Sequence, residues 1–317
     1  MNASFTIPES QAHRNYWFAA CVVACVAAFQ APLRSLMQMA LDSDTYSHIL
    51  IVPIISIFLL WMERERIFQN EGRNRAGAGV LFAVGILLSA IGWKQASLFA
   101  GSDWPGFYIL GFLCLLWAGF LFFYGARAFN AGLFPLLFLL LMVPLPVFLL
   151  DRFIAWLQVG SADVAEWIFH LSGIPILRRG LIFILPQVSI EVAKECSGIR
   201  STQALLITCL LAGHLFLRAN WRRAALLVAA VPVLIIKNGV RIATLTLLAV
   251  RVDPSFLTGR LHHDGGFVFF ALAMLILLPL LWLLQKTEAA PIRFREKKSK
   301  PAEKEILDPI AGKSLLR

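Results

Sequence analysis

The sequence predicts an all-α polytopic membrane protein with about eight transmembrane helices. Hydrophobic residues make up 59% of the 317 residues and charged residues only 15%, and the mean hydropathy is +0.73. These values lie outside the range of soluble globular domains. A helix needs about 20 apolar residues to cross the hydrocarbon core. The apolar runs lie roughly at 16–33, 47–62, 76–93, 106–124, 132–150, 199–217, 224–250 and 265–284.

The distribution of basic residues predicts that both termini are cytoplasmic. The polar residues 1–15 form the expected cytoplasmic N-terminus, with no cleavable signal peptide, residues 16–284 form one membrane domain, and residues 285–317 form a basic cytoplasmic tail. With this orientation, the inside segments carry more than twice as many Lys and Arg residues as the outside segments. Such an excess is typical of cytoplasmic loops.

The net charge of +10 favours membrane lipids as partners and argues against a nucleic-acid partner. Many of the basic residues lie in the C-terminal tail, where glutamates are interleaved with them. A juxtamembrane segment of this kind is attracted to anionic lipid headgroups. Of the five cysteines, all except Cys196 fall inside apolar runs, so the sequence predicts neither a disulfide framework nor a metal-binding pair.

An extracytoplasmic loop at 151–198 separates the fifth and sixth runs. In its first half, Trp156, Trp167 and other apolar residues recur at helical spacing, with Gln158 and Ser161 between them. This pattern is typical of an amphipathic helix in the outer membrane interface. The second half is β-branched and breaks at Gly180 and again near residue 186, which predicts a short β-hairpin.

The hairpin leads into Glu195-Cys196-Ser197-Gly198, at the start of the sixth run. The N-terminal turn of a helix stabilises a thiolate through its free amides and dipole, and a nearby cation adds to this effect. Gly198 would allow a substrate backbone to approach closely, although a simple helix-entry turn also explains a Ser-Gly pair. Cys196 is therefore a candidate nucleophile.

Arg241 lies about two-thirds of the way along the seventh run. A cation inside a membrane helix costs about 2.5 to 3.5 kcal/mol on insertion scales, so it is expected to face a polar cavity or a partner. Asn238, one turn earlier on the same helix face, is the obvious local companion.

His262 and His263 lie at the outer entrance of the last run, at the level predicted for Cys196 and Arg241. A thiol, an imidazole and a guanidinium can supply a nucleophile, a general acid/base and an oxyanion stabiliser for acyl transfer. The histidines of the chain do not share a side and a spacing typical of metal ligands, so no metal site is predicted.

These motifs resemble the exosortase/archaeosortase family of membrane cysteine transpeptidases. The resemblance rests on Cys196-Ser-Gly-Ile-Arg200, on Asn238-Gly-Val-Arg241, and on His262 followed by glycine and an aromatic-rich span. The segment 44–53 also resembles the family's entry into the second span, with Ile49 where that family usually has glycine. The resemblance covers about 40–285.

The resemblance implies a role for each matching residue. Cys196 would be the nucleophile, with Arg241 and a histidine as its catalytic partners; the glycine and aromatics favour His262 over His263. Arg200, Asn238, Ser197 and Gly198 would support the site or bind substrate, and no cofactor is implied.

The resemblance also implies the substrates and the place of the reaction. Clients would be secreted proteins with a C-terminal sorting signal: a Pro-Glu-Pro-like motif, one membrane helix and a basic end. Arg200, Arg178 or Arg179 could pair with an acidic residue of that motif. The enzyme would lie in the bacterial inner membrane with its active site on the periplasmic face, and the acceptor (lipid, glycan or water) stays open.

Two other classes of function are compatible with the residues alone. Arg241 and Asn238 in a kinked span could bind the anionic solute of a transporter or channel, although the chain has no internal repeat. Alternatively, the chain could be a non-catalytic component of an exopolysaccharide export system, with the extracytoplasmic loop as its contact surface.

Overall fold

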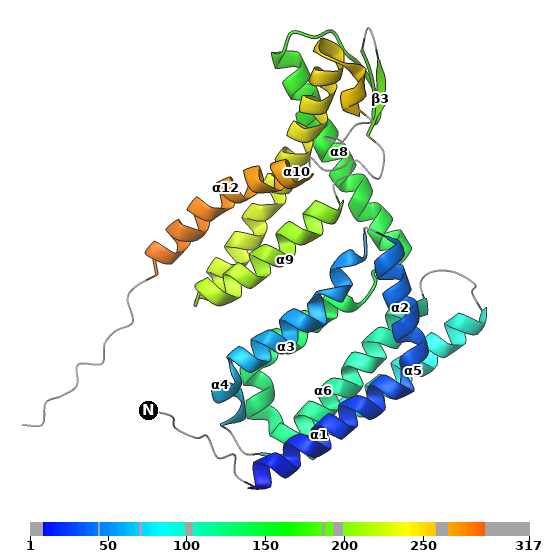
Figure 1. The fold of residues 1–317 in the computed structure, drawn as a ribbon, viewed down its shortest axis with the longest axis vertical. Coiled ribbons are helices and arrows are strands. Elements are labelled where there is room, and N and C mark those ends of the chain that lie inside the picture. Colours follow the sequence, from blue (N-terminus) through cyan, green and yellow to red (C-terminus); the bar gives the residue numbers. More distant parts are fainter. Residues whose placement is uncertain are drawn as a thin grey trace, which may run out of the picture.

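The computed structural model describes residues 9–43, 45–69, 72–98, 104–185, 188–192, 199–257 and 266–288. Two helical groups are joined by the long helix α8 (Figure 1). The first group contains α1 (Glu9–Ala28), α2 (Gln30–Asp42), η1 (Ser47–Leu50), α3 (Val52–Met62), α4 (Arg64–Phe68), α5 (Arg75–Leu98), α6 (Trp104–Ala131), α7 (Leu133–Phe138) and η2 (Leu139–Met142). After α8 (Val147–Leu171) come β1 (Leu177–Arg179), β2 (Ile182–Ile184), β3 (Ser189–Glu191), α9 (Ile199–Phe216), α10 (Asn220–Arg251), η4 (Pro254–Leu257) and α12 (Gly266–Lys286).

Five described helices are long and apolar enough to cross a membrane: 75–94, 105–131, 199–216, 220–251 and 266–286. They coincide with five of the predicted runs. The runs at 16–33 and 132–150 instead coincide with helix pairs bent by 73° and 92°, and the run at 47–62 forms a shorter apolar helix. The described residues therefore contain five spans, or up to seven if each bent pair is one span.

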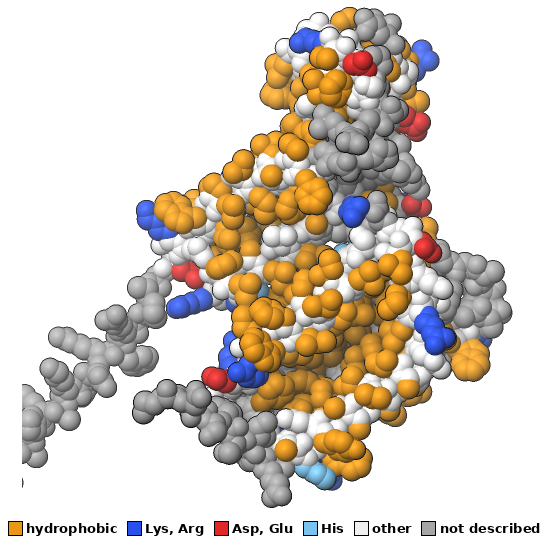
Figure 2. Space-filling view, viewed as in Figure 1, with side chains coloured by type: hydrophobic (Ala, Val, Ile, Leu, Met, Phe, Trp, Pro, Cys, Tyr) orange, Lys and Arg blue, Asp and Glu red, His pale blue; other side chains and the backbone are white. Residues whose placement is uncertain are grey.

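The outer surface of the helical groups is apolar. Figure 2 shows hydrophobic side chains spread over the visible helices, whereas the charged side chains lie mostly around the margins of the view. Phe267 on α12 is 83% exposed, and Ile54 on α3 is 67% exposed. Exposure of so many large apolar residues is expected for helices whose solvent is lipid.

The two helical groups meet through a polar contact beside their apolar interface. His214 near the end of α9 lies 2.6 Å from a carboxylate oxygen of Glu63, which follows α3, and its ring stacks on Phe134 of α7 at 3.7 Å. Glu63 also accepts a hydrogen bond from Arg66. We call the region around this contact the basic end. It contains Arg64, Arg66, Arg73, Arg127, Arg218 and Arg222.

Helix α8 covers most of the segment for which the sequence predicts an interfacial amphipathic helix. The helix begins at Val147, four residues before the predicted loop. Gln158 and Ser161 are buried, whereas Trp156 and Trp167 are 50% and 65% exposed, so the two polar side chains face other parts of the protein. Both side chains form hydrogen bonds to other segments inside the protein, which removes the usual cost of burying them.

Helices α8 and α10 approach each other closely at Gly239. A Cβ atom on Gly239 would lie 2.5 Å from the Cβ of Val164 and 2.9 Å from the carbonyl oxygen of Ser161. Only a glycine allows the two backbones to come this near. This contact fixes the position of α10, and of the polar residues on it, relative to α8.

A three-stranded antiparallel sheet, ordered β1-β2-β3, occupies the segment for which the sequence predicts a hairpin. Gly180, with a φ of 64°, lies in the turn between β1 and β2, and Phe183 pairs with Arg178 on one side and with Ile190 on the other. Phe183 and Val192 pack against Ile242 of α10 and Phe169 of α8. The sheet and the ends of α8 and α10 form what we call the hairpin end.

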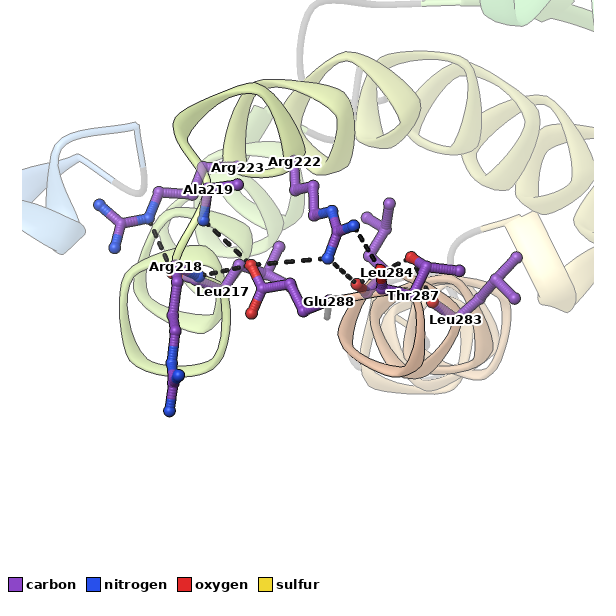
Figure 3. Close-up of polar contacts among 9 residues, drawn as sticks. All are labelled: Leu217, Arg218, Ala219, Arg222, Arg223, Leu283, Leu284, Thr287 and Glu288. Atoms are coloured by element: carbon purple, nitrogen blue, oxygen red, sulfur yellow. Dashed lines mark hydrogen bonds and ion pairs between the residues drawn. The ribbon is translucent and has the colours of Figure 1, made fainter. Parts of the chain in front are cut away.

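At the basic end, Glu288 ties the end of α12 to the turn between α9 and α10 (Figure 3). One carboxylate oxygen accepts hydrogen bonds from the backbone amides of Arg218 at 2.7 Å and Ala219 at 3.0 Å. Arg222 lies 3.7 Å from the same oxygen and donates to the carbonyls of Leu284 and Thr287. Two amides of the turn before α10, and carbonyls at and just after the end of α12, obtain partners in this way.

We expect Gly239→Ala to lower the midpoint of thermal unfolding in detergent. The added methyl group would force α8 and α10 apart, and overpacking of this kind costs about 1 to 3 kcal/mol. The matched control is Gly79→Ala in α5, where a Cβ would meet nothing within 4 Å. A Gly239→Ala protein that unfolds at or above the wild-type temperature would contradict the close contact.

We also expect Glu288 to make stability depend on pH. The hydrogen bond from Ala219, followed by that from Arg218 and the charge of Arg222, holds the pKa of Glu288 below its ordinary 4.5. The stabilisation is therefore present above about pH 4.5 and is lost as the pH falls through the lowered value. Between about pH 5 and pH 3, the unfolding midpoint should fall further for wild type than for Glu288→Gln. Glu65→Gln, at an exposed residue of α4, is the control and should follow the wild-type curve.

Candidate active site

Helix α10 carries two of the predicted site residues near the hairpin end. Asn238 is 1% exposed, and its side-chain amide donates to the Ser161 hydroxyl of α8 at 3.1 Å. Arg241 is half-buried three residues later. Because α10 begins at Asn220 and rises 1.5 Å per residue, Arg241 lies about 30 Å along its axis. That distance is close to the full thickness of the hydrocarbon core, so if α10 begins at one membrane boundary, Arg241 lies near the opposite one.

A buried lysine, for which the motifs predicted no role, adjoins these residues. Lys237 is 3% exposed and donates its ammonium proton to the hydroxyl of Ser201 in the first turns of α9. It lies one helical turn before Arg241, so two cations occupy successive turns of α10. The sequence contained a signal for this residue, namely a lysine four residues before an arginine inside an apolar run. Cations inside a membrane span usually serve a function.

Gln158 of α8 holds the segment that leads to Cys196. Its buried side-chain amide donates to the carbonyl oxygen of Val192 at 2.6 Å. Val192 follows β3 and is 1% exposed, packed in one cluster with Ile242 of α10. On the other side of residues 193–198, Ile199 packs against Leu157 of α8 and Ile235 of α10. The described residues on both sides of the Cys196 motif are thus anchored to α8 and α10.

Arg178 has a different role from the one considered for it. Its guanidinium donates to Asp163 at 2.7 Å and to Glu166 at 2.6 Å, both on α8, and lies over the ring of Phe183. Burial works to lower the pKa of Arg178, but the hydrogen bonds and charges of Glu166 and Asp163 outweigh it and raise that pKa. Arg178 therefore fixes the sheet to α8 with its charge paired to two carboxylates, whereas Arg179 is exposed.

The remaining candidate residues are placed only in part. Cys196, Ser197, Gly198, His262 and His263 lie outside the described residues. Arg200, in the first turn of α9, is exposed. Within the described ranges, no group of three or more His, Cys, Asp and Glu side chains lies close enough together to hold a metal ion.

Comparison with known proteins identifies the family. The family model of the transmembrane exosortase (EpsH type) matches residues 38–279, which is more than half of the chain and includes every candidate site residue. No curated protein and no solved structure gives a match. The chain, a multi-pass membrane protein, belongs to the transmembrane exosortase family.

Proposed function

We propose that this exosortase is a membrane cysteine peptidase and transpeptidase that cleaves the C-terminal sorting signal of secreted proteins. The observation that carries the proposal is the position of Arg241. It lies on α10 beside Ile242, which packs against Val192, and Val192 precedes Cys196 by only four residues. Covalent geometry keeps the Cα of Cys196 within about 14 Å of that of Val192 and within about 11 Å of that of Ile199.

In the proposed reaction, the Cys196 thiolate attacks the carbonyl carbon of the client's scissile peptide bond. Arg241 donates hydrogen bonds to the oxyanion of the tetrahedral intermediate. The C–N bond then breaks, and His262 gives a proton to the departing amine. An acceptor amine or water attacks the thioester carbonyl, loses a proton, and expels the thiolate, which restores the enzyme.

The client helix would lie among the spans, with its pre-helix motif at the hairpin end. The apolar exterior of the helical groups offers such a helix the same environment as lipid. The excess of Lys and Arg at the basic end favours a cytoplasmic location for that end. The hairpin end would then face the periplasm of a bacterial inner membrane, with a Pro-Glu-Pro-like motif as the recognised signal.

Cys196→Ala should abolish processing of a tagged client co-expressed with the enzyme, followed as loss of the client's C-terminal tail. Removing a nucleophile costs at least about a thousandfold in rate. Cys209→Ala is the control, because Cys209 is a buried thiol of α9, the helix that follows the Cys196 motif in the sequence. A folded Cys196→Ala protein that processes the client as fast as wild type would disprove the nucleophile assignment.

Arg241→Lys should lower the processing rate by about 10²- to 10³-fold, the usual effect of removing one oxyanion donor. Lysine keeps the charge but lacks the planar set of donors. Arg251→Lys serves as control, since Arg251 lies on the same helix, is exposed, and donates only to the Ser172 carbonyl among the hydrogen bonds described. Equal processing by the two variants would exclude a direct role for Arg241.

A further inference from the structure

A pocket of about 240 Å³ lies at the basic end, where α5 begins and α6 bends. It is lined by Gly72, Arg73, Asn74, Tyr124, Ala126 and Arg127. Two of these residues are arginines, and none is acidic. The pocket is separate from the candidate active site, which is built near the hairpin end.

The local backbone forms this pocket for a clear physical reason. Gly125 interrupts α6 with a φ of 81° and a ψ of 175°, which side-chain-bearing residues rarely adopt. A Cβ on Gly125 would lie 2.6 Å from the carbonyl oxygen of Gly72, so residues before α5 pack directly on the α6 backbone. Asn74 accepts a hydrogen bond from the amide of Gly77 through its side-chain oxygen, which leaves the side-chain NH₂ as a donor.

A third arginine approaches from α1. The guanidinium of Arg14 lies 5.3 Å from the centre of the Tyr124 ring, and the Tyr124 hydroxyl donates to Asn15 at 2.9 Å. The Nε of Arg14 is buried and has no hydrogen-bond partner among the described residues.

Arg14, Arg73 and Arg127 differ from other described arginines in their lack of a neighbouring carboxylate among the described residues. Arg66, Arg178 and Arg222 each lie within 4.0 Å of a carboxylate. Among the described residues, no carboxylate makes such a contact with Arg14, Arg73 or Arg127. Arg73 and Arg127 line the pocket, and Arg14 lies against Tyr124 in its wall. These guanidinium groups attract an anion from outside the protein, because no described carboxylate balances their charge.

We propose that this pocket binds the phosphate of an anionic phospholipid headgroup. Guanidinium groups and amide donors match phosphate oxygens in geometry and charge. The walls are the segment just before α5 and the bend of α6. Because α5 and α6 are long and apolar enough to cross the membrane, their ends are expected at the level of the lipid headgroups. The volume is below the roughly 300 to 1,000 Å³ of sites that enclose a drug-sized molecule, which suits a headgroup rather than a whole ligand.

The test is lipid retention measured by native mass spectrometry on the purified full-length protein. Wild type and the Arg73→Gln/Arg127→Gln double variant are each titrated with phosphatidylglycerol, which is anionic, and with phosphatidylcholine, which is zwitterionic. We expect wild type to prefer phosphatidylglycerol and the double variant to bind it about 25-fold more weakly, at about fivefold for each charge removed. Arg64→Gln is the matched control, because Arg64 is an exposed arginine of the basic end that stacks on Trp61 outside the pocket.

A second arm separates a lipid from a soluble anion. Inorganic phosphate is added at millimolar concentration to the phosphatidylglycerol complex. A lipid site should resist this competitor. Displacement of the lipid together with loss of the preference for phosphatidylglycerol would assign the pocket to free phosphate and overturn the lipid proposal. Arg73→Lys/Arg127→Lys keeps the charge and should retain most of the binding, which separates the charge effect from misfolding.

Equal phosphatidylglycerol retention by wild type, the double Gln variant and Arg64→Gln would overturn the proposal. The readout requires no peptidase activity, so it stands apart from the proposed function.

Discussion

The close contact of α8 with α10 at Gly239 is the constraint on which the candidate site depends. It brings Ser161 within hydrogen-bond distance of Asn238, and Gln158, one turn earlier on α8, reaches the carbonyl of Val192. One helix therefore fixes both the segment that precedes Cys196 and the helix that carries Arg241. In an apolar surrounding these bonds have no competition from water, so each holds its two segments in one register.

The length of α10 explains how a membrane protein places this site beyond the hydrocarbon. Thirty-two residues of α-helix extend about 48 Å, whereas the hydrocarbon core is about 30 Å thick. If α10 starts at the basic boundary, its last three turns project beyond the opposite one. There they pack against the sheet through Ile242 and Ala243, so the hairpin end rests on a rigid extension of a membrane helix. With α10 placed in this way, Arg241 lies where the helix leaves the hydrocarbon, and a cation is less costly there than at the centre of the membrane.

Hydropathy predicted the five long spans because each is a continuous apolar run, and motif spacing predicted that Asn238 and Arg241 share a helix face. Hydropathy did not predict the bends between paired helices, because it contains no information on the direction of the helix axis. The 92° bend could have been read from Pro144 and Pro146 inside the run at 132–150, since proline ends helices. The burial of Gln158 and Ser161 could not have been predicted, because their partners lie 34 and 77 residues away in sequence. The placement of Cys196 and His262 relative to Arg241 remains a prediction from the motifs.

Two cations on successive turns of one helix repel each other, and their presence requires a physical reason. Lys237 gives up most of its water to lie against Ser201, so the protein keeps this charge buried at a free-energy cost instead of extending it to solvent. A positive potential maintained next to Arg241 favours negative charge on any group nearby, and its strength increases as the local dielectric falls. Both the thiolate and the tetrahedral oxyanion of an acyl transfer carry such charge only transiently. In the proposed reaction, the two cations would stabilise those species more than the neutral peptide bond from which they form, and a difference of this kind accelerates a reaction.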